Sequence, residues 1–414
     1  MLPPGVGPWN PRSAPPTVEP DPGNAGEGSV LVAETADLVV AGGGVIGTAI
    51  AWRAAAAGLD VVLADPARDE AASLVAAGML APVSESMFGE DALLRLNLLA
   101  VRQFEPFAAK LEEATGHQVG LRREGTLAVA YDPGDHAALA RMTAFRRSVG
   151  LDAEELDSRA CRRLEPFLSP DVRGGVLFAG DWSVDNRRYA AALREAARSA
   201  KVRFVRDRVL AVRARGGRAR GARFADAGDV DAGQVVVAAG CWSGGIAGLP
   251  GPLRSAVRPV KGQLLRLRNP DGFPAVISHT IRATVQGRDI YLVPRACGEV
   301  VVGATQEERG LDQTVTAGAV HDLLHDAMSL LPVTSELLLA ETCAGLRPGT
   351  PDNGPILGRC GPDGLLLATG HYRNGILLSP VTADAAVALL TGGQPASEWE
   401  PFTPERFTRE DGSR

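Results

Sequence analysis

The fold is decided by one stretch, Asp37-Leu-Val-Val-Ala-Gly-Gly-Gly-Val-Ile-Gly47. It predicts a short apolar strand that turns through Gly42-x-Gly44-x-x-Gly47 into an Ala-rich helix. Gly42 permits the tight turn, Gly44 lets the backbone approach a pyrophosphate, and Gly47 lets the helix pack closely on the strand. The start of that helix offers free N–H groups and the positive end of its dipole to phosphates.

A second predicted strand supports this interpretation. Gly58 ends the helix, Asp60-Val-Val-Leu-Ala-Asp65 follows, and Asp65 lies 18 positions after Gly47. A carboxylate at the end of the second strand hydrogen-bonds a ribose hydroxyl in dinucleotide sites. The sequence therefore predicts a dinucleotide-binding protein, and the alternative is a glycine-rich turn in another kind of α/β protein.

Composition narrows the class further. A chain of 414 residues has room for two domains, and a net charge of −6 argues against nucleic acid or an anionic membrane as the main partner. The five Cys are dispersed and form no CxxC pair, so no disulfide framework or zinc knuckle is indicated and a reducing cytoplasm fits. The sequence contains no run of 18 apolar residues, so no membrane span is predicted.

Residues 1–34 hold eight prolines and predict a disordered Pro-rich tail that is not a secretory signal. An over-extended start codon is the other explanation, so translation of 1–34 in the native protein stays open.

The rest of the sequence contains two kinds of predicted strand. Continuous apolar strands that end in glycine, Gln234–Gly240 and Gly364–Gly370, predict a parallel sheet covered on both faces. Alternating segments between 256 and 305 predict an antiparallel sheet with one polar face. Helices are predicted at 90–114, 135–149, 187–200, 317–331 and from 376 through 390. We expect a discontinuous dinucleotide domain built from 36–88, 183–250 and 343–395, a substrate domain built from 89–182 and 251–342, and a C-terminal tail at 396–414.

Residues from about 36 to 390 resemble the glycine oxidase and D-amino-acid oxidase group of FAD-dependent oxidoreductases, and within it the glycine oxidases of thiamin biosynthesis. The segments that carry the resemblance are Gly42–Gly47, Ala77-Gly-Met-Leu-Ala-Pro82, Val235-Val-Val-Ala-Ala-Gly-Cys-Trp-Ser243, Val260-Lys-Gly-Gln263, Tyr291-Leu-Val-Pro-Arg295, Gly345-Leu-Arg-Pro-Gly-Thr-Pro-Asp-Asn-Gly-Pro-Ile-Leu-Gly358 and Gly370-His-Tyr-Arg-Asn-Gly-Ile-Leu-Leu-Ser-Pro380. The resemblance implies an α/β fold: an FAD-binding Rossmann-like domain of the glutathione-reductase type, with an inserted α+β substrate domain that carries the antiparallel sheet. It also implies a homo-oligomer.

The resemblance also implies roles for single residues. The pyrophosphate would be held by Gly42, Gly44, Val45, Ile46 and Gly47. The adenosine ribose would be bound by Asp65, and the adenine side would be contacted by Val209. Ser73, Ala77, Gly78 and Met79 lie along the cofactor and its flavin ring. The pyrimidine end of the flavin is wrapped by His371, Tyr372, Arg373, Asn374, Gly375, Ile376 and Leu377. Arg347 binds the substrate carboxylate, and Tyr291 and Arg373 line the pocket.

Three departures from the family pattern stand out. Asp65 replaces the commoner Glu, the pair Leu74-Val75 is bulkier than usual, and Gln306 lies where relatives often carry an apolar residue. The last departure leaves the preference among glycine, sarcosine and small D-amino acids open.

An amino-acid oxidase must fix a carboxylate while one Cα–H bond faces flavin N5. A guanidinium does this with two charge-assisted hydrogen bonds, and we expect Pro348 and Gly349 to stop the strand and expose Arg347. Tyr291 either donates to the same carboxylate or satisfies a backbone carbonyl, and Arg373 contacts flavin, substrate or its own loop. The helix after Gly375 would stabilise negative charge at the flavin C2 carbonyl. The expected reaction gives an imino acid, then a 2-oxo acid, ammonia and hydrogen peroxide, with no side chain acting as acid or base.

Two other functions are alternatives to this one. A related FAD dehydrogenase would pass its electrons to a quinone or carrier, and a flavin-binding subunit would be structural or regulatory. A nicotinamide enzyme fits less well because Gly370–Pro380 resembles a flavin-wrapping element. His321 and His325 share a helix face but lack a third ligand, so no metal is expected.

Overall fold

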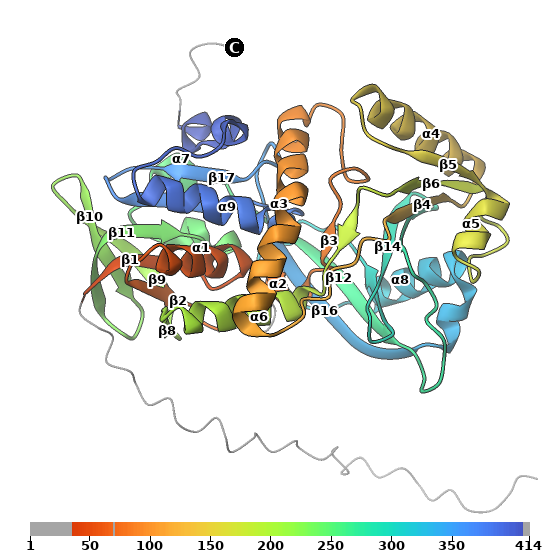
Figure 1. The fold of residues 1–414 in the computed structure, drawn as a ribbon, viewed down its shortest axis with the longest axis horizontal. Helices are drawn as coiled ribbons and strands as arrows, with labels where there is room; N and C mark the ends of the chain where they lie inside the picture. The colour runs from red at the N-terminus through yellow and green to blue at the C-terminus, as the bar shows by residue number, and fades with distance from the viewer. Residues whose placement is uncertain (1–34, 69–70, 409–414) are drawn as a thin grey trace, which may run out of the picture. The chain divides into compact units, whose positions relative to one another are not determined.

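The computed structural model describes residues 35–68 and 71–408, so the predicted tail at 1–34 lies outside the described residues. The first sheet contains β1 (Thr35–Ala41), β2 (Val61–Ala64), β8 (Arg203–Val205), β9 (Val209–Arg215), β10 (Arg218–Phe224), β11 (Asp229–Val237), β17 (Ile356–Arg359) and β18 (Leu365–Thr369). Its order is β17-β18-β11-β1-β2-β8, and β10 and β9 extend it from β11 (Figure 1).

The centre of this sheet is parallel, as predicted from the continuous apolar runs. Val39 of β1 pairs with Val235 of β11 on one side and with Val62 of β2 on the other. All three valines are 0 % exposed. Strands covered on both faces need apolar side chains at every position, which explains why these segments do not alternate.

Four helices pack around this sheet in one hydrophobic cluster. They are α1 (Val45–Ala56), α3 (Asp91–Thr115), α6 (Asn186–Ser199) and α9 (Gly375–Leu390). A methyl group on Gly47 would overlap the carbonyl of Gly42, so the glycine does permit the close helix–strand packing. Helix α3 falls in the range expected for the substrate domain, yet it packs against α6 and α9 because Leu96, Phe104 and Leu111 are buried there.

The second sheet has the order β16-β12-β15-β14-β13-β4-β6-β5. Its strands are β4 (Thr126–Ala130), β5 (Glu154–Asp157), β6 (Gly174–Phe178), β12 (Arg258–Arg268), β13 (Thr280–Val285), β14 (Arg288–Pro294), β15 (Glu299–Gly303) and β16 (Leu338–Gly349), and its helices are α4 (Pro133–Ser148), α5 (Ser158–Leu164) and α8 (Ala317–Leu330). The antiparallel pairing predicted between 256 and 305 is confirmed, and β13 pairs in parallel with β4.

Strand β16 ends at Gly349, as expected from the Pro348-Gly349 pair, although both residues still pair with β12. Proline is tolerated on an edge strand, where its missing N–H faces away from the ladder. The domain boundary expected at residue 343 would divide this strand, so the boundaries themselves stay a prediction.

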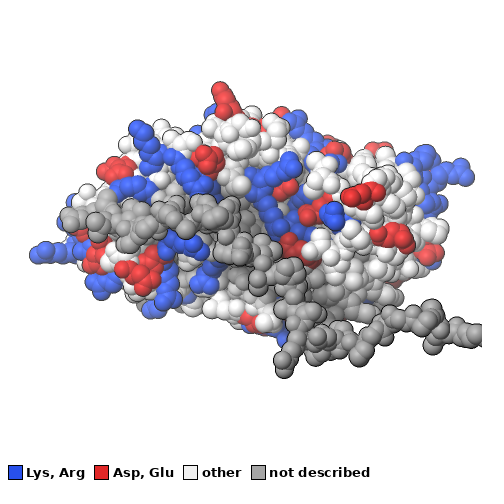
Figure 2. All heavy atoms as spheres, turned by 90° about the horizontal axis from the view of Figure 1, so that it is seen from below, with Lys and Arg blue, Asp and Glu red and all other residues white. Residues whose placement is uncertain are grey.

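Short elements complete the described chain. They are α2 (Ala72–Val75), the ribbon of β3 (Met79–Leu80) with β7 (Trp182–Ser183), α7 (Gly251–Arg254), and the 3₁₀ helices η2 (Gly240–Gly245), η3 (Pro332–Glu336), η4 (Ser397–Phe402) and η5 (Pro404–Phe407). Trp399 and Phe402 are 2 % and 4 % exposed, so this part of the expected C-terminal tail packs onto the protein. No helix among 35–68 and 71–408 has the length and apolar character needed to cross a bilayer. Basic and acidic side chains are interspersed on the face seen in Figure 2.

Candidate active site

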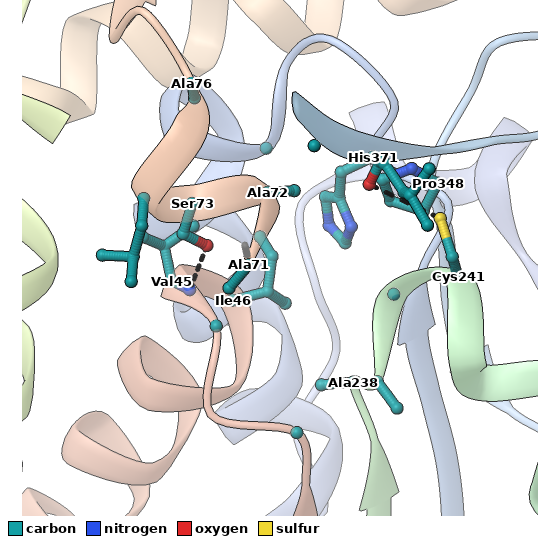
Figure 3. A pocket seen from close by; sticks show the side chains of 18 of the residues that line it. Val45, Ile46, Ala71, Ala72, Ser73, Ala76, Ala238, Cys241, Pro348 and His371 are labelled. Carbon is teal, nitrogen blue, oxygen red and sulfur yellow. Dashed lines mark hydrogen bonds between the residues drawn. The ribbon is translucent and has the colours of Figure 1, made fainter. Parts of the chain in front are cut away.

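One cavity of about 560 Å³ joins the glycine turn of the first sheet to β12, β14 and β16 of the second. Figure 3 shows Val45 and Ser73 on one side of this cavity and Cys241, Pro348 and His371 on the other. The cavity lies at the carboxyl ends of β1 and β2, where open parallel sheets bind their ligands. Its volume falls within the range of cofactor pockets.

The nucleotide end is shaped by missing side chains. Gly42 has φ +116°, and a methyl group there would lie 2.5 Å from the Ala238 carbonyl oxygen. Gly44 caps α1 without a side-chain hydrogen bond, and the Val45 amide instead donates to Ser73 Oγ at 3.0 Å (Figure 3). Gly43, Gly44 and Ile46 line the cavity at the start of α1, a position that suits a pyrophosphate.

Asp65 lies beside this turn, and both of its carboxylate oxygens accept hydrogen bonds. Its Oδ2 accepts a hydrogen bond from Arg194 Nη2 at 2.6 Å, and its Oδ1 accepts one from the Ala67 amide at 3.0 Å. Arg194 comes from α6, and sequence reasoning did not find it because nothing in the local pattern pairs it with β2. The arginine fixes the orientation of the carboxylate that would bind the ribose.

The middle of the cavity is walled by small residues. Gly78 has φ +76°, and a methyl group on it would overlap the carbonyl of Val184. Arg295 Nη2 donates to Ala77 O at 2.6 Å, and burial lowers the pKa of this guanidinium to about 10. The buried arginine thus fixes the run from Ala77 to Met79 that the flavin ring was expected to contact.

The opposite wall is the loop before α9. His371 is 3 % exposed and its Nε2 lies 3.0 Å from Thr382 Oγ1, while burial lowers its pKa to about 3. The imidazole is therefore neutral and structural at physiological pH. Tyr372 has φ +45°, a backbone conformation that turns the chain sharply into α9.

Not every expected cofactor residue lines the cavity. Gly47 and Leu377 are packed in the core, and Asn374 faces a separate small pocket instead. The expected residues that do line the cavity are Gly42, Gly44, Val45, Ile46, Asp65, Ser73, Ala77, Gly78, Met79, Val209, His371, Tyr372, Arg373, Gly375 and Ile376.

Arg347 lies at the far end, on β16. Its Nη1 donates to the Thr305 carbonyl at 3.2 Å, and a methyl group on Gly262 would lie 2.5 Å from its Cζ. Within residues 35–68 and 71–408, no carboxylate lies within ion-pair distance of this guanidinium. Tyr291 packs its hydroxyl over Gly303, and burial raises its pKa although Arg347 opposes the rise. The tyrosine hydroxyl is therefore protonated and available as a donor.

Two further charges were not found from the sequence. Glu85 lines the same end of the cavity, and Arg282 Nη1 donates to its Oε1 at 2.6 Å. Arg373 also lines the cavity, and its guanidinium carbon lies 5.0 Å from the Tyr372 ring centroid. Glu85 and Arg282 are far apart in sequence and belong to no motif, so only the fold brings them together.

His321 and His325 lie on α8, mostly exposed, and each contacts its neighbouring aspartate. Across the described part of the chain, no group of three or more His, Cys, Asp or Glu side chains is arranged to hold a metal ion.

The glycine turn, the helix start and the oriented acid define a dinucleotide-binding enzyme. The guanidinium of Arg347 lies at the other end of the same cavity. The profile of the family described as "FAD dependent oxidoreductase" matches residues 37–389. The chain belongs to this family, and FAD is its cofactor. The fit is supported by the cavity itself, which the glycine turn and Asp65 line at one end, and by the tight turn at Gly42, where a side chain would overlap the Ala238 backbone.

Individual relatives agree with this assignment. The chain is 32 % identical to the glycine oxidase of Geobacillus kaustophilus over 375 residues, which cover 89 % of this chain and 97 % of that protein. It is 35 % identical to the bifunctional protein ThiO/ThiG of Synechocystis sp. over 375 residues, or 90 % of this chain and 54 % of that protein. The chain thus spans about half the length of these bifunctional relatives. The crystal structure of glycine oxidase from Geobacillus kaustophilus superposes with a TM-score of 0.83 at 31 % identity, covering 92 % of this chain and 100 % of that one.

Proposed function

We propose that this enzyme oxidatively deaminates glycine, and sarcosine or small D-amino acids, to glyoxylate or the matching 2-oxo acid, with ammonia (or the amine) and hydrogen peroxide as the other products. The observation that carries the proposal is Arg347, an arginine in the cavity that bonds backbone carbonyls but no carboxylate of the described chain. A guanidinium held this way offers its planar fork to a carboxylate from outside. Relatives named glycine oxidase support the choice of substrate.

The residues of the chain would act by binding and orientation. Arg347 would hold the carboxylate, and the protonated hydroxyl of Tyr291 would donate a further hydrogen bond to it. FAD, when bound, supplies a hydride acceptor at N5 and returns its electrons to oxygen. The first amides of α9, which line the cavity at Gly375 and Ile376, would stabilise negative charge at the pyrimidine edge. Fixing one Cα–H bond in this frame is how the site would lower the barrier.

We also propose that the reaction feeds the thiazole branch of thiamin biosynthesis. The enzyme would act in the cytoplasm as a homo-oligomer. The support is similarity to the relatives named ThiO/ThiG, of which the chain matches about half. A second enzyme would then consume the product, the imine of glyoxylate.

Peroxide stoichiometry tests the reaction as an oxidase reaction. The holoenzyme is supplied with glycine under air, and peroxide and glyoxylate are measured together. We expect about one peroxide for each glyoxylate formed, as the two-electron balance requires. Glyoxylate formed only when an artificial electron acceptor is added would instead identify a dehydrogenase.

A further inference from the structure

Glu85 is an acidic side chain at the substrate end of the cavity. Among the described residues that line the cavity, the acids are Asp65 and Glu85, and Asp65 lies at the nucleotide end with Arg194. Glu85 shares its end of the cavity with Arg347 and Tyr291. A negative group therefore faces the same space as the guanidinium that would take a substrate carboxylate.

The turn that carries Glu85 is clamped from both sides by buried charges. Asp181 accepts hydrogen bonds from the Val83 amide at 2.9 Å and from the Ser84 amide at 3.1 Å. Arg146 donates to the Ser84 carbonyl and to Ser86 Oγ. Asp181 is 0 % and Arg146 is 6 % exposed, so both charges have been taken out of water to hold this turn. Such burial is costly unless hydrogen bonds compensate for it, and here those hydrogen bonds hold the turn in place.

The carboxylate of Glu85 is ionised, and one of its two oxygens accepts no hydrogen bond from the described residues. Burial raises the pKa of Glu85, but the positive charges of Arg282, Arg373 and Arg347 outweigh burial and hold the pKa below its usual range. Arg282 occupies Oε1, and no donor of the described chain bonds Oε2. A carboxylate can accept several hydrogen bonds, so Oε2 is open to a donor from the cavity. The charged and titratable groups that act on Glu85 or on its partner are Arg146, Asp181, Arg282, Asp289, Tyr291, Arg347 and Arg373.

We infer that Glu85 binds the amino group of the substrate through Oε2 while Arg347 binds its carboxylate. The inference rests on the proposed function and adds the second anchor point. Two opposite charges at one end of a cavity match the two ends of a zwitterion. The pair also selects substrates whose nitrogen carries at least one N–H, because a nitrogen without a hydrogen has nothing to donate to Oε2. The carboxylate would favour the protonated amine and so raise the pKa of the bound amino group.

The test compares wild-type holoenzyme with Glu85→Gln under anaerobic rapid mixing. The amine must lose its proton before the hydride leaves, so the rate of flavin reduction by glycine rises with pH. Removing the negative charge should shift this rise to lower pH by about one unit. It should also weaken glycine binding about tenfold, the usual worth of a hydrogen bond to a charged group. Acetate has the carboxylate but no amine, so its inhibition constant should change less than twofold.

Glu90→Gln is the matched control, because Glu90 lies on the same connection but outside this cavity and bonds Asn353 instead. If Glu85→Gln fails to fold with Arg282 left unpaired, the double variant Glu85→Gln with Arg282→Met removes both charges and takes its place. Equal losses for glycine and acetate with an unmoved pH profile would overturn the inference. Failure of glycine to reduce the wild-type flavin would instead overturn the proposed function.

Discussion

Gly262 determines where the guanidinium of Arg347 can lie. The residue is on β12, and the Arg347 side chain from β16 crosses directly over it, so that a methyl group on Gly262 would lie 2.5 Å from Cζ. Carbon atoms in contact stay about 3.5 Å apart. Gly262→Ala should therefore displace the guanidinium by about 1 Å. A misplacement of this size costs on the order of 100-fold in rate, or about 2.7 kcal/mol of transition-state stabilisation.

Steady-state kinetics with glycine measure this effect as kcat/KM. Gly318→Ala is the control, because a methyl group at position 318 on α8 meets nothing within 4 Å. Both variants should bind FAD as the parent does, since neither substitution touches the glycine turn. Wild-type kcat/KM in a folded, FAD-loaded Gly262→Ala variant would refute the claim that the position of Arg347 sets catalysis.

Four further predictions follow from the site. Arg347→Ala should cost about 3 kcal/mol in kcat/KM, or about 150-fold, while FAD content is unchanged; normal kinetics with glycine would remove this residue from the substrate site. The rate of flavin reduction should rise between about pH 6 and 9 as the substrate amine is deprotonated, and a flat profile would argue against loss of the amine proton before hydride transfer. Asp65→Ala should raise the dissociation constant of FAD about tenfold, measured by titration of the apoprotein; unchanged affinity would mean that the carboxylate serves only Arg194. His371 has a folded pKa of about 3, below its unfolded value near 6.5, so its contribution to stability is complete above about pH 6.5 and is lost as pH falls toward 3. At pH 5 the loss is about 2 kcal/mol, and His371→Gln should show a correspondingly smaller fall in the free energy of unfolding between pH 7.5 and 5, with FAD in equal excess.

The sequence was most informative where local pattern and structure share one cause. The strands around Val39, Val62 and Val235 were predictable because a strand covered on both faces must be apolar throughout. The glycine turn was predictable because Gly42 takes a backbone conformation that other residues avoid. Both features are visible within a few neighbouring residues.

What the sequence withheld depends on distant parts of the chain. The pairing of Asp65 with Arg194, and of Glu85 with Arg282, joins residues that are separated by more than 100 positions and belong to no common motif. The place of β16 in its sheet was hidden for a similar reason. Its end at Gly349 was expected, but only the topology shows that β16 is an edge strand, where Pro348 can pair with β12.

Anaerobic reduction of the bound flavin tests the central claim most directly. The yellow holoenzyme is mixed with glycine, sarcosine and D-alanine in turn, and the visible absorbance of the flavin is followed beside that of Arg347→Ala at equal FAD content. The account predicts that at least glycine bleaches the wild-type flavin and that the variant needs far higher concentrations of it. A wild-type flavin that stays oxidised with all three amino acids, or a variant that is bleached as readily as the wild type, would contradict the account.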